Sequence, residues 1–259
     1  LEDDVKTSQS YALLNCSVYN YLLGTIMNLF DLLRAGVHIV SVVGSGGKST
    51  LVVELASELN ATTIIATTTH MFAPPKLPLL VDANKADISE ALKSSRVICT
   101  GQWEAGKVGT KLCAPTLSFL DLAKSACYVL VEADGAKRLP LKAHAAHEPA
   151  IAEGTDETIQ VLGASGFGKP VAQVVHRPEI FCELGECASD ALCTPDLCAT
   201  VIAKEHARKS VRADILVINQ VEDNQSWEAA RHLHTLLRAQ KDDIAIVAGS
   251  IRAHRLIQL

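Results

Sequence analysis

The chain has 259 residues, of which 48% are hydrophobic and 20% are charged, and its mean hydropathy is +0.19. This composition excludes a wholly disordered chain and a fibrous repeat, and the length is enough for one large globular domain or two small ones. Its 24 lysines and arginines are outnumbered by 29 aspartates and glutamates. Because no basic field extends over the chain, we expect no nucleic-acid partner and no membrane partner, and any bound anion must be held locally.

The first 26 residues are predicted to precede the organised fold. The stretch 11–30 is apolar, but three asparagines, a serine and a glycine interrupt it, so we do not expect it to span a membrane. The acidic beginning lacks the basic n-region of a signal peptide, and eight cysteines without such a leader are typical of free thiols in a reducing cytosol. We therefore expect a cytoplasmic protein with a poorly ordered extension over residues 1–26 and a single domain over residues 27–259.

From residue 27 onward, short apolar runs alternate with helical patterns. Residues 27–33 predict a short amphipathic helix. Strands are expected over residues 37–43, 62–67, 96–100, 127–132, 158–162, 214–219 and 244–248. Helices are expected over residues 50–60, 195–205 and 227–240, the first and last with apolar residues at helical spacing. Most of the strands are continuously apolar, as strands buried on both faces are. The alternation predicts an α/β fold in three layers, with a mostly parallel sheet and helices on both faces.

A glycine-rich turn, GSGGKST at residues 44–50, lies between the first buried strand and the helix after it. Glycines let backbone N–H groups curl around a phosphate, the helix N-terminus adds its positive end, and Lys48 supplies a mobile cation. We therefore expect a nucleoside triphosphate, ATP or GTP, to bind here, and the fold to be like that of phosphate-loop NTPases. The residues expected to contact the nucleotide at this loop are Gly44, Ser45, Gly46, Gly47, Lys48, Ser49 and Thr50.

Other interpretations of this turn stay open. The usual phosphate-loop spacing places a first glycine where this chain has Val42, so the loop is two residues shorter than the usual one. A dinucleotide-binding fingerprint fits less well, because Ser49 occupies its third glycine position and no acidic residue ends the second strand. The simplest alternative is a turn that only reverses the chain.

Two carboxylates, Glu132 and Asp134, stand at the end of the buried strand at residues 127–132. Ligands of open α/β sheets gather at the carboxyl ends of strands, so both carboxylates would face the glycine-rich loop if the two strands are neighbours. Mg²⁺ prefers oxygen ligands, and we expect Ser49 with Glu132 or Asp134 to hold it together with the phosphates. Alternatively, Asp134 is the base that positions an attacking group, or the segment is only an Asp-Gly turn with a capping or salt-bridged glutamate.

A basic stretch follows directly. Its charged and imidazole side chains are Lys137, Arg138, Lys142, His144, His147 and Glu148. Cations beside an Asp-Gly turn suit an anionic substrate or a transferring phosphoryl group. The expected catalytic residues are therefore Lys48, Asp134, Lys137, Arg138 and Lys142. A solvated surface run is the alternative for each single member of the stretch.

Two further strand ends carry polar residues. Thr69 and His70 follow the strand at residues 62–67 and are expected to touch phosphate or metal-bound water, with a surface histidine after a β-branched strand end as the alternative. Asn219 is expected to contact the nucleotide, because it begins a degenerate form of the Asn-Lys-x-Asp tetrad that reads guanine. Gln220 and Glu222 replace the two charged residues of that tetrad, so the sequence does not specify the base.

Four cysteines, Cys182, Cys187, Cys193 and Cys198, are separated by four, five and four intervening residues. These spacings match neither the paired zinc pattern nor the plant-type iron–sulfur pattern. We expect packed thiols rather than metal ligands, with Cys198 inside the helix at residues 195–205.

Several motifs, taken in order, resemble those of the YqeC family. They are VVGSGGKSTL at 42–51, TTTH at 67–70, VEADGAKRLPLKA at 131–143, HEP at 147–149, HRPE at 176–179 and INQ at 218–220. The resemblance covers about residue 27 to the C-terminus and departs from the family pattern at Gln220 and Glu222. It implies an accessory protein for selenium-dependent molybdenum hydroxylases, with the molybdenum cofactor or a hydroxylase apoprotein as partner. The short loop also looks like that of Mur-type peptide ligases, in which a strand-end glutamate holds Mg²⁺, and Glu132 is the matching position.

Together these features predict a Mg²⁺-dependent protein that binds a nucleoside triphosphate. Its expected reaction is phosphoryl or nucleotidyl transfer, or nucleotide hydrolysis, in the maturation of selenium-dependent molybdenum hydroxylases. The alternative from another class is a nucleotide-gated assembly factor that docks on an apoenzyme without modifying a small molecule. A second alternative is a nucleotide-binding protein that has lost its function, in which Lys48→Ala does not change selenium-dependent hydroxylase activity.

Overall fold

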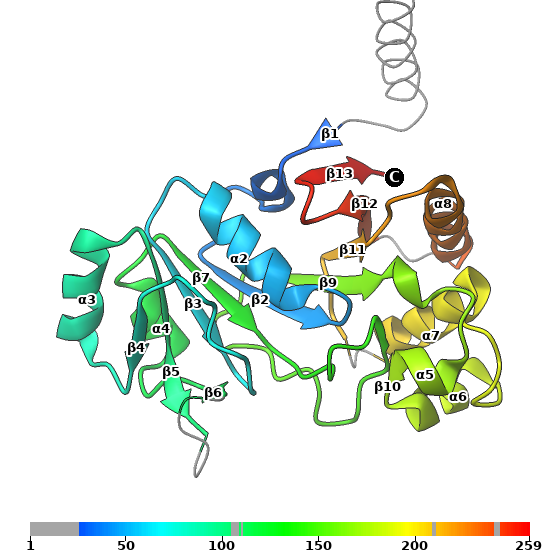
Figure 1. Cartoon of the computed structure of the whole chain (residues 1–259), viewed down its shortest axis with the longest axis horizontal. Helices are drawn as coiled ribbons and strands as arrows, with labels where there is room; N and C mark the ends of the chain where they lie inside the picture. Colours follow the sequence, from blue (N-terminus) through cyan, green and yellow to red (C-terminus); the bar gives the residue numbers. More distant parts are fainter. Residues whose placement is uncertain (1–25, 105–108, 110, 209–210, 241–243) are drawn as a thin grey trace, which may run out of the picture.

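The computed structural model describes residues 26–104, 109, 111–208, 211–240 and 244–259 (Figure 1). Its main sheet consists of β1 (Ile26–Met27), β2 (Ile39–Gly44), β3 (Thr63–Thr67), β4 (Leu79–Val81), β5 (Val97–Trp103), β6 (Leu112–Cys113), β7 (Tyr128–Glu132), β9 (Glu157–Gly163), β11 (Ile215–Asn219), β12 (Ala245–Ser250) and β13 (Arg255–Gln258). The order is β1-β13-β12-β11-β9-β2-β7-β3-β5-β4, with β6 paired to β5. Every pairing from β12 to β4 along this order is parallel. A separate small parallel sheet joins β8 (Leu141–Lys142) and β10 (Val175–His176).

Helices cover both faces of the main sheet, which confirms the α/β fold in three layers. They are α2 (Lys48–Glu58), α3 (Lys85–Ser94), α4 (Phe119–Ala123), α5 (Val171–Val174), α6 (Pro178–Gly185), α7 (Pro195–Ala207) and α8 (Asn224–Ala239). On one face, Leu51 and Leu55 of α2 pack in a cluster with Val40 and Val42 of β2. On the other face, α3 and α4 pack on β3, β5 and β7, and α7 and α8 pack on β9, β11 and β12.

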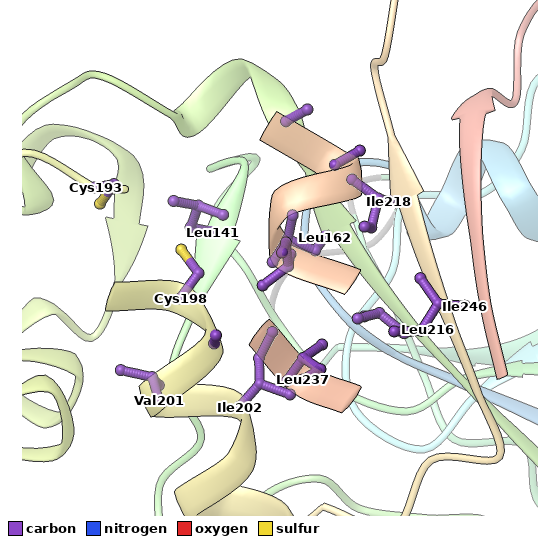
Figure 2. Packing of buried hydrophobic residues seen from close by; sticks show 14 of the residues in the cluster. Leu141, Leu162, Cys193, Cys198, Val201, Ile202, Leu216, Ile218, Leu237 and Ile246 are labelled. Carbon is purple, nitrogen blue, oxygen red and sulfur yellow. The ribbon is translucent and has the colours of Figure 1, made fainter. Parts of the chain in front are cut away.

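The core beneath α7 and α8 is shown in Figure 2, where Leu216 of β11 shares one cluster with Ile202 of α7 and Leu237 of α8. The four cysteines singled out in the sequence belong to this cluster or pack against it: Cys182, Cys187, Cys193 and Cys198. Burial raises the pKa of Cys193 to about 12, so its thiol stays protonated at neutral pH. The environment fits the expectation of packed thiols.

The register of the central strands brings three strand ends together. β2 pairs with β7 on one side, where Val42 lies opposite Glu132, and with β9 on the other, where Gly44 lies opposite Val161. Every residue of β2 is buried, which explains its continuous apolar run. The glycine-rich loop therefore leaves the sheet between the ends of β7 and β9.

The predicted strands correspond to β2, β3, β5, β7, β9, β11 and β12, and the predicted longer helices correspond to α2, α7 and α8. The helix expected over residues 27–33 is wrong in part. Met27 pairs with Leu256 in an antiparallel ladder, and only Leu29–Leu32 form a short 3₁₀ helix, η1. Pairing with β13, from the far end of the sequence, overrides the local helical pattern.

The extension expected over residues 1–26 lies, except for Ile26, outside the described residues, so its order and the single-domain organisation stay predictions. Among the helices that the structure describes, none has the length and apolar character needed to cross a bilayer.

Candidate functional site

The glycine-rich loop joins β2 to α2 with a backbone that only glycine adopts readily. Gly46 has φ +79° and Gly47 has φ +143°. A Cβ on Gly46 would lie 2.3 Å from the backbone nitrogen of Gly163 in β9, so the loop and that strand approach too closely for any side chain. α2 begins at Lys48 without a side-chain cap. Its first-turn N–H groups have no intrahelical partner and suit an anion.

Lys48 and Ser49 reach the end of β7. The Lys48 ammonium donates to the carbonyl of Gly44 at 2.7 Å and lies 3.0 Å from Asp134 Oδ1 and 3.8 Å from Glu132 Oε1. Ser49 Oγ donates to Glu132 Oε2 at 2.7 Å. The neighbouring positions of β2 and β7 thus bring together the four side chains that were expected to surround phosphate and Mg²⁺.

Asp134 is fully buried and forms the centre of an ionic cluster. Its Oδ2 accepts from the backbone N–H of Gly44 at 2.8 Å and from His144 Nε2 at 3.0 Å, and lies 3.1 Å from the Lys142 ammonium. Burial alone would raise the pKa of Asp134, but Lys48, His144 and Lys142 together lower it well below its usual range. Asp134 is therefore a carboxylate that fixes the loop and its lysine in place.

His144 connects this cluster to α7. Its Nδ1 lies 3.2 Å from both carboxylate oxygens of Glu205, and its backbone N–H donates to Glu205 Oε1 at 2.7 Å. Burial opposes the charged form of His144, but Asp134 and Glu205 outweigh it and raise its pKa. Because both ring nitrogens face carboxylates, the site favours the imidazolium form, in which each nitrogen carries a proton for one carboxylate.

Lys142, one of the expected catalytic cations, lies inside the cluster instead of facing solvent. Its ammonium donates to the carbonyl of Gly135 at 2.6 Å and lies 3.1 Å from Glu148 Oε2. Arg177 Nε donates to the same Glu148 oxygen at 2.9 Å. Burial would raise the pKa of Glu148, but Arg177 and Lys142 lower it to about 2. Lys142 is thus buried and engaged by two carboxylates.

Lys137 and Arg138 are placed differently. Both residues are exposed and have left-handed backbone conformations, with φ +47° and +61°. The Arg138 guanidinium stacks 4.8 Å from the ring centroid of Phe72, which follows β3. Both side chains thus lie on the surface, a few residues beyond the end of β7.

The donor set beside the loop fits Mg²⁺. Ser49 and Glu132 offer hydroxyl and carboxylate oxygens, which are hard ligands. Burial raises the pKa of Glu132 despite the opposing effect of Lys48 and Ser49, and a divalent cation would favour its ionised form. Within the described residues, no three His, Cys, Asp or Glu side chains are arranged as a metal site. Mg²⁺ would therefore depend on phosphate oxygens as well, and Glu132 is the better ligand because three cations already surround Asp134.

Thr69 and His70 follow β3, next to β7. Thr67 Oγ1 donates to the carbonyl of Glu132 at 2.7 Å, and Thr69 N–H donates to Thr67 Oγ1 at 3.0 Å. The Thr69 hydroxyl is buried and has no hydrogen-bond partner among the described residues. His70 is half-exposed, and its Nε2 lies 4.0 Å from Glu104 Oε1.

A cleft of about 750 Å³ opens on the β9 and β11 side of the loop. Gly47 and Thr50 form one end of it, and the segments after β9, β11 and β12 form its walls. Asn219 stands between the loop and this cleft. Its Nδ2 donates to the carbonyl of Gly46 at 2.8 Å, and its Oδ1 accepts from Ile251 N–H at 3.0 Å.

Glu205 is a member of the ionic cluster that the sequence motifs did not reveal. A signal was present, because Glu205 continues the spacing of Cys198, Val201 and Ile202, which are buried on the core face of α7. A glutamate on an apolar helical stripe requires a buried partner. His144 and Glu148 were noticed only as parts of a basic stretch.

The family model described as "YqeC protein" matches residues 40–179. The "Uncharacterized protein YqeC" of Escherichia coli (strain K12) is 32% identical to this chain over 231 residues, which cover 85% of this chain and 90% of that protein. The chain belongs to the YqeC family. The family match spans the glycine-rich loop, Glu132, Asp134 and Arg177, and it ends before Asn219 and the β11 side of the cleft.

Proposed function

We propose that this YqeC protein binds a nucleoside triphosphate with Mg²⁺ at the glycine-rich loop. The observation that carries the proposal is the meeting of Lys48 and Ser49, at the start of α2, with Glu132 and Asp134, at the end of β7. A loop of glycines with positive φ, an uncapped helix start, a lysine and an acidic strand end is the combination that phosphates and a hard cation require.

Each residue then has a defined task. The amides of Gly46, Gly47 and the first turn of α2 bind the phosphates, because Gly44 N–H and Ser45 N–H already donate to Asp134 and Val161. Lys48 exchanges part of its contact with Asp134 for a phosphate oxygen. Ser49 and Glu132 hold Mg²⁺, which neutralises phosphate charge when bound. Asp134 keeps Lys48 oriented, and its lowered pKa makes it a weak proton acceptor.

The reaction proposed is phosphoryl or nucleotidyl transfer, or nucleotide hydrolysis, in the maturation of selenium-dependent molybdenum hydroxylases. Lys137 and Arg138 support it, because exposed cations beyond the end of β7 suit an anionic acceptor or a transferring phosphoryl group. The molybdenum cofactor or a hydroxylase apoprotein as partner, the absence of nucleic-acid and membrane partners, and a cytoplasmic location remain parts of the proposal.

A nucleotide-gated assembly factor is the second candidate. The contacts that favour it run from Lys48 through Asp134 and His144 to Glu205 on α7. When Lys48 turns to a phosphate, the charge balance around Asp134 changes, and α7 is within reach of that change. Analysis of the products separates the candidates, because an enzyme yields a new phosphorylated or nucleotidylated compound, whereas a switch shows slow hydrolysis that only a partner protein accelerates.

Nucleotide binding is tested by thermal unfolding with ATP, GTP and CTP, each with and without Mg²⁺. A nucleotide at 100 times its Kd should stabilise the wild-type protein by about 2.7 kcal/mol. Lys48→Ala should abolish this stabilisation. Lys93→Ala, which removes an exposed lysine of α3, should retain it. A wild-type protein that no nucleotide stabilises would contradict the proposal.

A further inference from the structure

We propose that the cleft beside the glycine-rich loop is a guanine-binding pocket in which the Glu222 carboxylate recognises the base. This inference rests on the proposed nucleotide binding and adds to it the identity of the base. The cleft volume of about 750 Å³ lies within the range of small-molecule sites. Because Gly47 and Thr50 line one end, a nucleoside whose phosphates lie on the loop extends into this cleft.

Asn219 fixes the geometry of the pocket. Both ends of its side-chain amide are engaged by the protein, at the carbonyl of Gly46 and at Ile251 N–H, and the residue is buried. Asn219 therefore holds the glycine-rich loop and the segment after β12 at a fixed separation. These bonds commit one of its two N–H groups and one lone pair of its oxygen to the protein, and we look to a further residue for selectivity between the bases.

Of the two acidic side chains that line the cleft, Glu222 is the more open to a ligand. Asp223 caps α8 by accepting from Ser226 N–H at 2.7 Å, and Gln220 Oε1 accepts from Ser165 Oγ at 2.5 Å. The Glu222 carboxylate is exposed, and the hydrogen bond that it accepts from Ser250 Oγ is long, at 3.3 Å. Its oxygens are thus placed on the cleft wall with capacity for further donors.

The hydrogen-bonding edges of the bases decide which nucleotide suits this carboxylate. Guanine presents two adjacent donors, N1–H and the N2 amino group, and a carboxylate accepts from both in parallel. Adenine and cytosine present a ring-nitrogen lone pair beside a single amino group, and that lone pair faces the carboxylate with repulsion. In this chain Glu222 stands where the guanine-reading tetrad has aspartate, so the acidic chemistry is retained with one more methylene.

The test is a competition assay in which Mg²⁺ complexes of GTP, ATP, ITP and XTP displace a fluorescent nucleotide. Charge-assisted hydrogen bonds of this kind predict that the wild-type protein binds GTP about 10- to 100-fold more tightly than ATP. ITP, which lacks the N2 amino group, should bind about tenfold more weakly than GTP.

The decisive variant is Glu222→Gln, with Glu228→Gln on the exposed face of α8 as the matched control. Glu222→Gln should weaken the binding of GTP by about 10- to 100-fold. It should strengthen the binding of XTP, because the glutamine amide accepts from N1–H and donates to the C2 carbonyl of xanthine. A gain for XTP also shows that the variant is folded. Equal binding of ATP and GTP that requires Lys48 but not Glu222 would overturn the guanine pocket and leave the proposed function standing. Failure of every nucleotide to bind the wild-type protein would overturn both.

Discussion

The two sides of the glycine-rich loop are built on different principles. On the β7 side, the loop is held by buried ions, with Asp134 at once against Gly44 N–H, Lys48 and His144. On the β9 and β11 side, it is held by neutral contacts, namely the close approach of Gly46 to Gly163 and the amide of Asn219. In the part of the chain that the structure describes, the cleft of about 750 Å³ opens on the neutral side. The charged side therefore sets the electrostatics of the loop, and the neutral side sets its position and leaves room for a ligand.

The charges on the β7 side of the loop are balanced, and substitutions of the charged residues there are expected to be strongly destabilising. With His144 protonated and Glu132 ionised, its cations are Lys48, Lys142, His144 and Arg177, and its carboxylates are Glu132, Asp134, Glu148 and Glu205. Removing one partner of a buried ion pair leaves an uncompensated charge, which costs far more than the loss of one neutral hydrogen bond. Substitutions on the two sides should therefore differ in size.

The largest effect is expected for Asp134→Asn, which leaves Lys48, Lys142 and His144 without their shared anion. The free energy of unfolding, measured by urea denaturation, should fall by about 3–5 kcal/mol. Asp190→Asn, at an exposed position, is the matched control and should change it by less than about 0.5 kcal/mol. If both variants were equally stable, the buried ions would not be what holds the loop on this side.

A smaller effect is expected for Asn219→Ala on the neutral side. The substitution leaves the carbonyl of Gly46 and the N–H of Ile251 without their partner and should lower the free energy of unfolding by about 1–3 kcal/mol. Nucleotide affinity should fall as well, because the loop loses its fixed position. A loss of stability as large as that of Asp134→Asn would remove the distinction between the two sides.

The smallest effect is expected for Glu148→Gln, and it should depend on pH. The pKa of Glu148 is about 2 in the folded protein, against an ordinary value of 4.5 that applies to the unfolded chain. Its stabilisation is therefore fully present above pH 4.5 and is lost as the pH falls toward 2. After allowance for solvent screening, the wild-type protein should exceed the variant by about 1–2 kcal/mol at pH 7.

The measurement is a series of urea denaturations of both proteins at pH 7, 5, 4 and 3. The gap in unfolding free energy should narrow steadily below about pH 4.5, as Glu148 begins to take up its proton in the unfolded chain. A gap that stayed constant over this range would mean that Glu148 acts through packing and not through its charge.

The sequence predicted the components of the site better than their environment. The glycine-rich pattern and the helical spacing after it were enough to predict the turn between β2 and α2, and strand ends were enough to find Glu132 and Asp134. The prediction that these carboxylates face the loop depended on β2 and β7 being neighbours, and sequence patterns do not give strand order. Short strands such as β4 and β6 were missed, since two or three residues carry no periodicity.

Burial was harder to predict than charge. Lys137, Arg138 and Lys142 look alike in sequence, yet Lys142 lies among carboxylates while the other two are exposed. The partner of His144 is 61 residues away, on a helix whose docking cannot be derived from local patterns. Long-range pairing of this kind decides which members of a basic stretch are structural and which remain open to a ligand.

The close approach of Gly46 to Gly163 has a consequence for protein engineering. Residues 44–50 are not expected to keep their shape when they are moved to another protein. Their conformation depends on Gly163 of β9, which has no side chain, and on the Asn219 amide as much as on their own glycines. A graft of this loop onto another scaffold would have to carry all three parts. Conversely, a search for relatives of this loop gains power when it requires a glycine at the end of the adjoining strand.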